Sequence, residues 1–379
     1  MTKKWSSRLT FLAFVVLMVG LGSNDSLRGI FSTIFQEHFS LTTTQLGLIV
    51  TASYIGNLVF LLVGGNLSTR FSKKRVLQVL ILIWMAALAL FAFTSNYTVL
   101  LIGMALALGS STLLNTTMNL ITPLLFATAP GFFVNFLFFT QEIGTSGSQY
   151  ILGSHADGFA FWQHTNLVLL ILGAVAFVLL LFCNVPEEAA DPADTPAQKG
   201  GYDWRIIVPY VLVFGFYFIA EHGVMNWMVA YGVDGLGLPQ ASAAKYLSVF
   251  FGGMMIGRLC LSPLVDKLGA LKSLAAFGGV SCVLYLIGSL GGALTMPVWA
   301  ISGLSFSILY PTLVMSIRLY FPAQQVSGAA GTILSIASLA DILFNVGFGK
   351  LVDMAGYAVS IRVLPLSVLA FFIVFMLFT

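Results

Sequence analysis

Charged side chains are scarce in this chain of 379 residues, where Asp, Glu, Lys and Arg together make up 8% of the sequence. Apolar residues make up 58%, and the mean hydropathy is +0.97. A water-soluble domain with that hydropathy would aggregate, so the composition excludes an ordinary soluble protein. It indicates a lipid bilayer as the solvent of the outer surface.

Clusters of reactive or metal-ligating residues are also missing. The three cysteines, Cys183, Cys260 and Cys282, each lie inside an apolar run, which is typical of packing residues rather than of a disulfide or metal site. The sequence contains no nucleotide-binding loop and no nucleophile triad, and no cleavable signal peptide is evident. We therefore expect no enzyme, no cofactor, no metal and no nucleic-acid partner.

Long apolar runs are what the sequence does contain, and they predict helices. In lipid, backbone polar groups must be satisfied within the protein, so only helices or closed barrels span it. Barrel strands would alternate every second residue, and stretches such as 76–93 do not. We predict an all-α integral membrane protein with twelve transmembrane helices, at 9–34, 44–69, 75–95, 98–128, 131–153, 165–185, 205–232, 241–265, 272–290, 293–319, 325–352 and 359–379.

The distribution of Lys and Arg predicts the orientation. With the N-terminus in the cytoplasm, the inner loops hold most of the basic residues, while the outer side holds only Lys350 and Arg362. Positive loops face the cytoplasm in membrane proteins. We therefore expect a multi-pass protein of the plasma (inner) membrane with both termini in the cytoplasm.

One stretch of the chain, 186–204, is too polar to span a membrane. It is acidic and rich in Pro and Ala, as is typical of a linker. We predict an N-terminal six-helix half over 1–185, a cytoplasmic linker over 186–204 and a C-terminal six-helix half over 205–379.

Matching marks in the two halves indicate an internal repeat. Arg70, after the second predicted span, corresponds to Lys267, which lies 197 residues later after the eighth. Asp157, after the fifth span, corresponds to Asp353, which lies 196 residues later after the eleventh. Independent marks at one offset indicate a duplicated unit. Two parallel six-helix repeats are the architecture of the major facilitator fold.

The basic loops resemble the cytoplasmic signature of the major facilitator superfamily, G-x3-D-R/K-x-G-x-R/K-R/K. The first copy departs from it at Thr69 and Ser72, whereas the second keeps the Asp and the Gly. Such loops pair charges and helix ends in one access state; the alternative is that they only anchor the inner side. The predicted gating residues are Arg70, Lys74, Arg75, Asp266 and Lys267.

Four acidic residues fall within predicted spans: Asp25, Glu142, Glu221 and Asp341. A charge at mid-bilayer costs about 2.5–3.5 kcal/mol on insertion scales, so such groups usually line a cavity or meet a partner. Asp25 and Glu221 are 196 residues apart and occupy equivalent positions in the first helix of each half. We predict that Asp25 binds the coupled proton, with Glu221 or Glu142 as the second acid.

Polar and aromatic side chains cluster in the same spans. Amides supply paired hydrogen bonds to hydroxyl groups and aromatic rings supply a flat apolar face, which together suit a sugar. The alternative for any single amide is a hydrogen bond between helices. We predict a cavity lined by the first, fourth, seventh and tenth helices, with substrate-binding residues Asn24, Arg28, Asn115, Asn119, Gln141, Asn226, Trp227, Tyr310, Asp341 and Asn345.

Several stretches resemble the fucose–galactose–glucose:proton symporter branch of this superfamily. They are Asn24-Asp25 in the first helix, Ala220-Glu221 with Trp227 in the seventh, and Tyr310-Pro311 in the tenth. The resemblance implies that Asp25 stands where the branch carries a coupling carboxylate. The branch also carries a Glu where this chain has Asn115, so its two-acid arrangement is not reproduced, and Glu142 is the candidate replacement.

The predicted function is proton-coupled uptake of a monosaccharide or similar small polar solute by a monomer, with the proton gradient as energy source. One alternative is proton-driven export of amphipathic compounds, although 144–149 lacks the Pro of the exporter motif. Another is a non-transporting membrane receptor on the same fold, which would not need Asp25 and Glu221 in a cavity.

Overall fold

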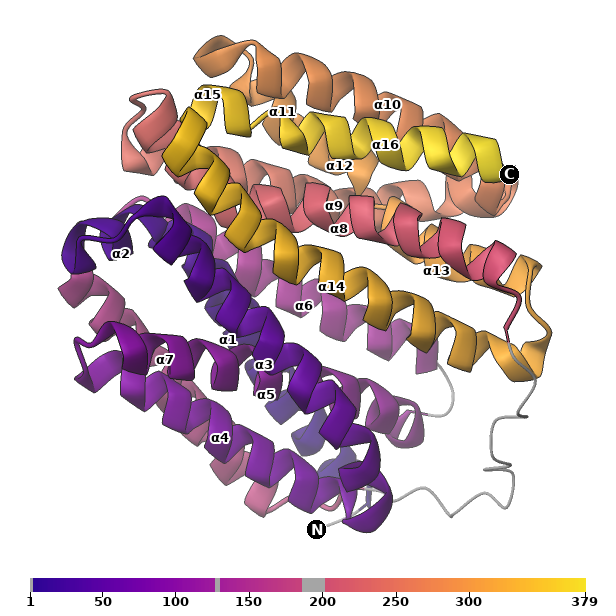
Figure 1. Ribbon diagram of the computed structural model, residues 1–379. Coiled ribbons are helices and arrows are strands. Elements are labelled where there is room, and N and C mark those ends of the chain that lie inside the picture. The colour runs from indigo at the N-terminus through magenta and orange to yellow at the C-terminus, as the bar shows by residue number, and fades with distance from the viewer. Residues whose placement is uncertain (1–2, 127–129, 186–201) are drawn as a thin grey trace. The chain divides into compact units, whose positions relative to one another are not determined.

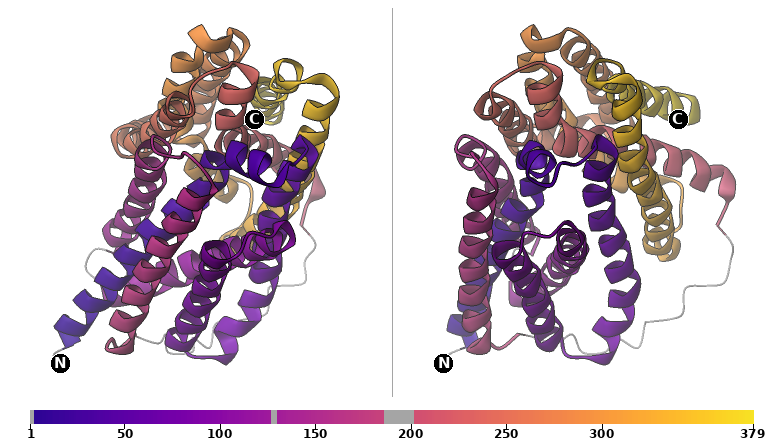
Figure 2. Two further views of the ribbon diagram at one scale, coloured as in Figure 1. Left: turned by 90° about the vertical axis from the view of Figure 1, so that its left-hand side faces the viewer. Right: turned by 60° about the vertical axis from the view of Figure 1, so that its left-hand side comes forward.

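The computed structural model describes residues 3–126, 130–185 and 202–379, apart from the side chains of a few residues inside helices. The chain forms two compact units, Met1–Ala190 and Asp191–Thr379, and each is a bundle of helices (Figures 1 and 2). All regular secondary structure in the described ranges is helical, as the composition predicted. Most of the predicted linker, 186–201, lies outside the described residues.

The described residues of the first unit form seven helices. They are α1 (Lys3–Ile30), α2 (Ser32–Phe39), α3 (Thr43–Arg70), α4 (Lys73–Phe93), α5 (Tyr97–Leu125), α6 (Pro130–Ile151) and α7 (Phe159–Leu181).

The second unit repeats this order with more interruptions. Its helices are α8 (Trp204–Ala230), η1 (Tyr231–Gly235), α9 (Gln240–Leu268), α10 (Ala270–Leu290), η2 (Gly292–Leu294), α11 (Met296–Ile301), α12 (Gly303–Phe306), α13 (Leu309–Ser316), η3 (Ile317–Leu319), α14 (Ala323–Ala355), α15 (Tyr357–Ser360) and α16 (Val363–Phe378).

Helix packing confirms the duplicated six-helix unit. In the first unit α1 packs against α6 and α7, α3 packs against α5, and α4 packs against α5 and α7. In the second unit α8 packs against α14 and α16, α9 against α11 and α12, and α10 against α11, α13 and α16. The same neighbours therefore meet in both halves.

Eleven helices in the described ranges are long and apolar enough to cross a membrane. They correspond to eleven of the twelve predicted spans. The twelfth, predicted at 131–153, is α6, which contains several residues whose side chains lie outside the described set. The helices have wide apolar outer faces, as a lipid environment requires.

Four predicted spans differ clearly from the observed helices. The twelfth, 359–379, is divided into α15 and α16. The first, 9–34, is interrupted at Phe31, where α1 ends and the short α2 begins. The sixth begins at Phe159 instead of 165, and therefore includes the polar residue Gln163. The side-chain amide of Gln163 donates a hydrogen bond to the backbone carbonyl of Thr94 at 3.4 Å. The tenth, 293–319, is divided into α11, α12, α13 and η3.

The divided tenth span has a local cause. Ser302, Ser305 and Ser307 each donate a side-chain hydrogen bond to a backbone carbonyl three residues earlier. Such bonds compete with the regular helical ladder and bend helices. Gly303 also packs directly on α9, where an added Cβ would lie 2.0 Å from the carbonyl oxygen of Phe250.

The three cysteines were expected to be packing residues, and two of the three are buried. Cys183 and Cys282 are buried, whereas Cys260 is exposed on α9. An apolar run in a membrane protein covers both the interior and the lipid-facing side of a helix, so the run alone could not separate them.

Glycines allow α1 and α6 to cross closely. A Cβ on Gly22 would lie 2.0 Å from the carbonyl oxygen of Gln141, and one on Gly144 would lie 2.1 Å from that of Val19. The hydroxyl of Thr145 donates to the carbonyl of Gly22 at 3.2 Å across this crossing. Small residues are the usual means of close helix approach in lipid.

We predict that Gly144→Ala destabilises the protein, because its Cβ would meet the α1 backbone and overpacking costs about 1–3 kcal/mol. Thermal unfolding of purified protein in one detergent measures the effect. Gly147→Ala on the same helix is the matched control, since a Cβ there meets nothing within 4 Å. Equal melting temperatures for the two variants would contradict the crossing described here.

Candidate functional site

The polar side chains of the first unit lie mainly on α1, α5 and α6. Asn24 is buried, and its side-chain oxygen accepts a hydrogen bond from the indole nitrogen of Trp84 at 2.8 Å. This bond ties α1 to α4. An intramembrane amide was expected either to bind the solute or to form a hydrogen bond between helices. Asn24 forms the hydrogen bond between helices.

Asp25 is on α1, and its side chain contacts α5. The hydroxyl of Ser111 on α5 donates to the Asp25 carboxylate at 3.5 Å, and the Asp25 side chain is only partly buried. Arg28, one turn further along α1, is 5% exposed, and its guanidinium lies 5.5 Å from the ring centre of Tyr54 on α3. A cation over an aromatic face is stabilised in the interior. Arg28 therefore stays inside the unit and does not reach the outer surface.

A row of amides continues from Ser111 along the same face of α5. Asn119 donates to the side-chain oxygen of Asn115 at 2.6 Å, and Asn115 donates to that of Gln141 on α6 at 2.6 Å. Ser111, Asn115 and Asn119 follow at intervals of four residues, so they lie on one side of the helix. We call Ser111, Asn115, Asn119 and Gln141 the α5 polar stripe; Asp25 stands at one end of it.

The α5 polar stripe has an unused acceptor. The side-chain oxygen of Asn119 is buried and has no hydrogen-bond partner among the described residues. Buried polar atoms are nearly always paired in folded proteins, so the unpaired oxygen of Asn119 is an exception that needs an explanation. Glu142 follows Gln141 on α6 and is partly buried, but the stripe itself does not include it.

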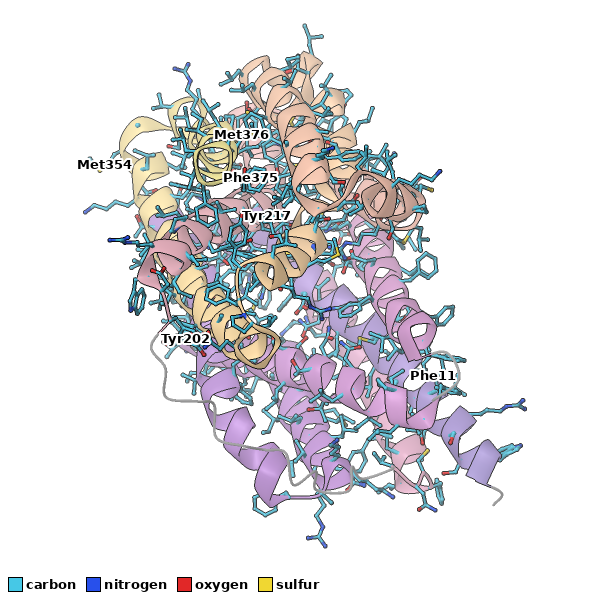
Figure 3. All side chains as sticks on the ribbon, turned by 90° about the vertical axis from the view of Figure 1, so that its right-hand side faces the viewer. Phe11, Tyr202, Tyr217, Met354, Phe375 and Met376 are labelled. Atoms are coloured by element: carbon cyan, nitrogen blue, oxygen red, sulfur yellow. The ribbon has the colours of Figure 1, made fainter. Side chains whose placement is uncertain are left out.

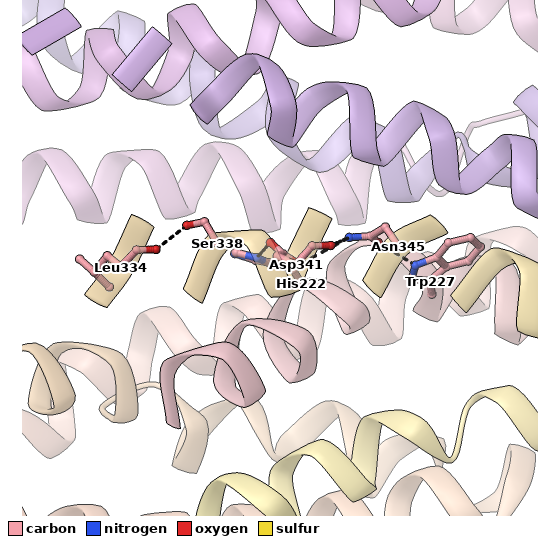
Figure 4. A network of polar contacts seen from close by, with 6 residues as sticks. All are labelled: His222, Trp227, Leu334, Ser338, Asp341 and Asn345. Atoms are coloured by element: carbon pink, nitrogen blue, oxygen red, sulfur yellow. Dashed lines mark hydrogen bonds and ion pairs between the residues drawn. The ribbon is translucent and has the colours of Figure 1, made fainter. Parts of the chain in front are cut away.

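In the second unit, a network of side chains joins α8 to α14 (Figure 4). Nδ1 of His222 lies 2.5 Å from the Asp341 carboxylate. Asn345 donates to the backbone carbonyl of Asp341 at 2.8 Å and accepts from the indole nitrogen of Trp227 at 2.9 Å. Asp341, Asn345 and Trp227 are all buried.

This network changes the reading of three predicted substrate-binding residues. Trp227, Asp341 and Asn345 use their polar atoms on one another instead of presenting them to open space. Asn226, next to Trp227, is also buried. His222 is not among the predicted site residues, and the structure makes it the partner of Asp341. The only sequence signal was that an intramembrane acid such as Asp341 needs a partner.

Tyr310 and Glu221 belong to an aromatic cluster of the second unit. The ring of Tyr310 lies 5.9 Å from that of Tyr217 and 6.2 Å from that of Phe218, between ring centres. Tyr217, labelled in Figure 3, is fully buried among the side chains of the second unit. Glu221 and Arg258 both lie close enough to act electrostatically on the hydroxyls of Tyr217 and Tyr310.

Arg258 is thus a second residue whose position the sequence left open. The structure places it on α9 in the electrostatic range of the same two tyrosines as Glu221. An acid, a base and two phenols are therefore gathered in one half, on α8, α9 and α13.

The predicted gating residues lie at helix ends where they are described. Lys74 donates to the carbonyls of Leu181 at 3.1 Å and Cys183 at 2.7 Å, at the C-terminal end of α7. A cation at a helix C-terminus is favoured by the helix dipole. Arg75 and Lys267 are exposed. The side chains of Arg70 and Asp266 lie outside the described residues.

A separate cavity of about 570 Å³ lies between α3, α4 and α5. Its walls are apolar side chains such as Val59, Val76 and Leu113, and Arg75 is the only charged residue among the lining side chains that the structure describes. Such walls offer few hydrogen bonds to a polar solute. In the described ranges, no cluster of His, Cys, Asp and Glu could hold a metal ion.

The family model of the Major Facilitator Superfamily matches residues 10–343 of the chain. The glucose/galactose transporter of Brucella abortus biovar 1 (strain 9-941) is 26% identical over 379 residues, covering 93% of this chain and 90% of that one. The L-fucose-proton symporter of Escherichia coli (strain K12) is 23% identical over 333 residues, covering 76% and 75%.

A solved structure extends the likeness to the fold. The crystal structure of a nucleoside transporter superposes with a TM-score of 0.79 over all of both chains, at 11% identity. Similarity at that identity concerns the fold alone. With the family model, the membrane-spanning helices and the repeated six-helix unit in agreement, the chain belongs to the Major Facilitator Superfamily and is a multi-pass membrane transport protein, not an enzyme.

Proposed function

We propose that this protein is a proton-coupled symporter that takes up a monosaccharide or a similar small polar solute by alternating access. One observation carries the proposal: the α5 polar stripe runs from the acid Asp25, through Ser111 and Asn115, to the unpaired oxygen of Asn119. The proposed proton site on α1 is thereby next to the proposed solute-binding amides on one face of α5. The names of the relatives from Escherichia coli and Brucella point to the same solute class.

The chemistry of the stripe favours a sugar over an amphipathic cation. Each amide in the row is both donor and acceptor, and a sugar hydroxyl is also both. A sugar can therefore replace the bonds between Asn115, Asn119 and Gln141 one for one. A lipophilic cation offers no such replacement and would leave buried amides unpaired, which costs about 1–3 kcal/mol for each group.

Asp25 is proposed to carry the coupled proton, with Glu221 or Glu142 as the second acid. Its carboxylate is half-buried and hydrogen-bonded to the stripe, so its protonation state alters the partner of Ser111. The energy source is the proton gradient. The proposed setting is the plasma membrane, with both termini in the cytoplasm and the protein acting as a monomer.

We predict that Asp25→Asn abolishes proton-driven accumulation of the sugar while sparing exchange down a gradient, since exchange needs no net proton movement. Accumulation and counterflow of radiolabelled L-fucose, galactose and glucose in proteoliposomes measure both. The accumulation ratio is expected to fall to about one. The control is Asp157→Asn, at an exposed site.

Wild-type accumulation in the Asp25→Asn protein would remove Asp25 from the mechanism. A loss of both activities together with a lower melting temperature would mean that Asp25 only stabilises the fold.

We predict that Asn115→Ala weakens sugar binding about 5- to 100-fold, because two hydrogen bonds at about 0.5–1.5 kcal/mol each are lost from the stripe. Equilibrium binding to purified protein measures the change. Thr116→Ala is the control, since Thr116 is exposed and its hydroxyl donates only to its own helix, to the carbonyl of Thr112. Equal affinities for Asn115→Ala and wild type would place the solute elsewhere.

We predict that Lys74→Ala slows transport with little change in sugar affinity. Lys74 holds the end of α7, so its loss shifts the equilibrium between access states without touching the stripe. The initial rate of counterflow and the equilibrium dissociation constant are compared, with exposed Lys350→Ala as control. A large loss of affinity at an unchanged maximal rate would argue against a gating role.

A further inference from the structure

We infer that His222 and Asp341 form a second proton-binding site, located in the second unit, and that the protons bound there determine how α8 packs on α14. The two side chains come from these two helices and approach within 2.5 Å. The role of this site in transport rests on the proposed function, but proton binding itself is measurable without any solute.

The charge balance of the pair depends on its proton count. With one proton the pair is neutral, whether as imidazolium with carboxylate or as imidazole with carboxylic acid. A second proton converts it to imidazolium with a neutral acid and a net charge of +1. Asp341 then carries its own proton and no longer offers an anionic acceptor to Nδ1, so the contact between the helices has to be remade.

Solvent reaches the pair mainly through His222. The His222 side chain is 24% exposed, whereas that of Asp341 is 3% exposed. Imidazole is the side chain that ordinarily exchanges its proton between pH 5 and 8. The geometry therefore makes His222 the entry point for the proton and Asp341 the buried member whose charge changes with it.

The charged neighbours within this unit are few. On α8, Glu221 precedes His222, and Phe218 stacks on the imidazole at 5.4 Å between ring centres. On α9 the basic residues are Arg258 and the exposed Lys245 and Lys267, while α16 carries no titratable side chain. On α14, Lys350 and Asp353 lie more than two turns from Asp341, and Asp341 is the acid that meets His222. Glu221 is thus the nearest negative group along the chain for balancing a second proton.

The network transmits the proton state of Asp341 along the helices. Asn345 contacts both the backbone and, at 3.5 Å, the carboxylate of Asp341, and its own oxygen accepts from Trp227. Trp227 is fully buried and packs on Phe348, 4.8 Å between ring centres. A change at Asp341 therefore reaches Trp227, so α8 and α14 respond at two points more than one turn apart.

The site belongs to the second half alone. At the offset of 196 residues, the counterparts of His222, Asp341 and Asn345 are Ser26, Thr145 and Gln149. None of these titrates near neutral pH. Thr145 bonds the Gly22 carbonyl, and the buried amide of Gln149 has no hydrogen-bond partner among the described residues. The ionisable pair is therefore specific to the second half. The equivalent helices of the first half, α1 and α6, are joined through small residues instead.

The test uses the full-length protein in lipid nanodiscs without solute, titrated from pH 8 to pH 5. Nuclear magnetic resonance follows the ring nitrogens of His222 and the indole N–H of Trp227, assigned with His222→Gln and Trp227→Phe. In wild type both signals are expected to shift with one common midpoint. Asp341→Asn is expected to move the His222 midpoint by at least one pH unit and to remove the pH dependence of Trp227. His164→Gln, at an exposed histidine of the first unit, is expected to change neither.

In the wild-type protein, a Trp227 signal that is independent of pH, or one with a midpoint different from that of His222, would overturn the inference. The wild-type titration is therefore a sufficient test even if Asp341→Asn fails to fold. An unchanged titration in a folded Asp341→Asn protein would overturn it as well. A common midpoint in a protein that moves no sugar in proteoliposomes would refute the proposed function and leave this site standing.

Discussion

A polar side chain inside a membrane-spanning helix has to find its partner within the protein, because lipid offers none. This constraint organises both halves of the molecule. Asn24 is bound by Trp84, Asn115 by Gln141, and Asp341 by His222. Each of these bonds joins two helices, so the polar residues that the bilayer makes costly also decide which helices are held together and in which rotation about their axes.

The same constraint separates residues that hold helices from residues that bind a solute. Asn24 and Trp227 are buried with their polar atoms in use. The α5 polar stripe is different, since its amides are only partly buried and one acceptor, on Asn119, is unpaired. The proposed function needs both kinds of polar residue. The first holds helices together, and the second is proposed to exchange its bonds for those of the solute.

Duplication supplied the two halves with one packing scheme but not with one chemistry. The crossing of α1 with α6 uses Gly22, Gly144 and a threonine, whereas the equivalent crossing of α8 with α14 uses an ionisable pair. The positions equivalent to His222 and Asp341 hold Ser26 and Thr145 in the first half. Only the second crossing therefore has an ionisable pair at these positions, even though the helices of the two halves follow the same order.

The sequence alone determined the fold class, because hydropathy, the helical run lengths and the 196-residue repeat are local or periodic properties of the chain. It also singled out Asp25, Glu221 and Asp341, because a charge within an apolar run is conspicuous. Only the tertiary structure decided the partners of these residues, because the partners depend on how each helix is rotated about its axis. Hydrophobic periodicity does not reveal that rotation when a helix is apolar on all sides. The pairing of His222 with Asp341 spans 119 residues, and the proximity of Arg258 to Tyr217 depends on how α9 turns against α8.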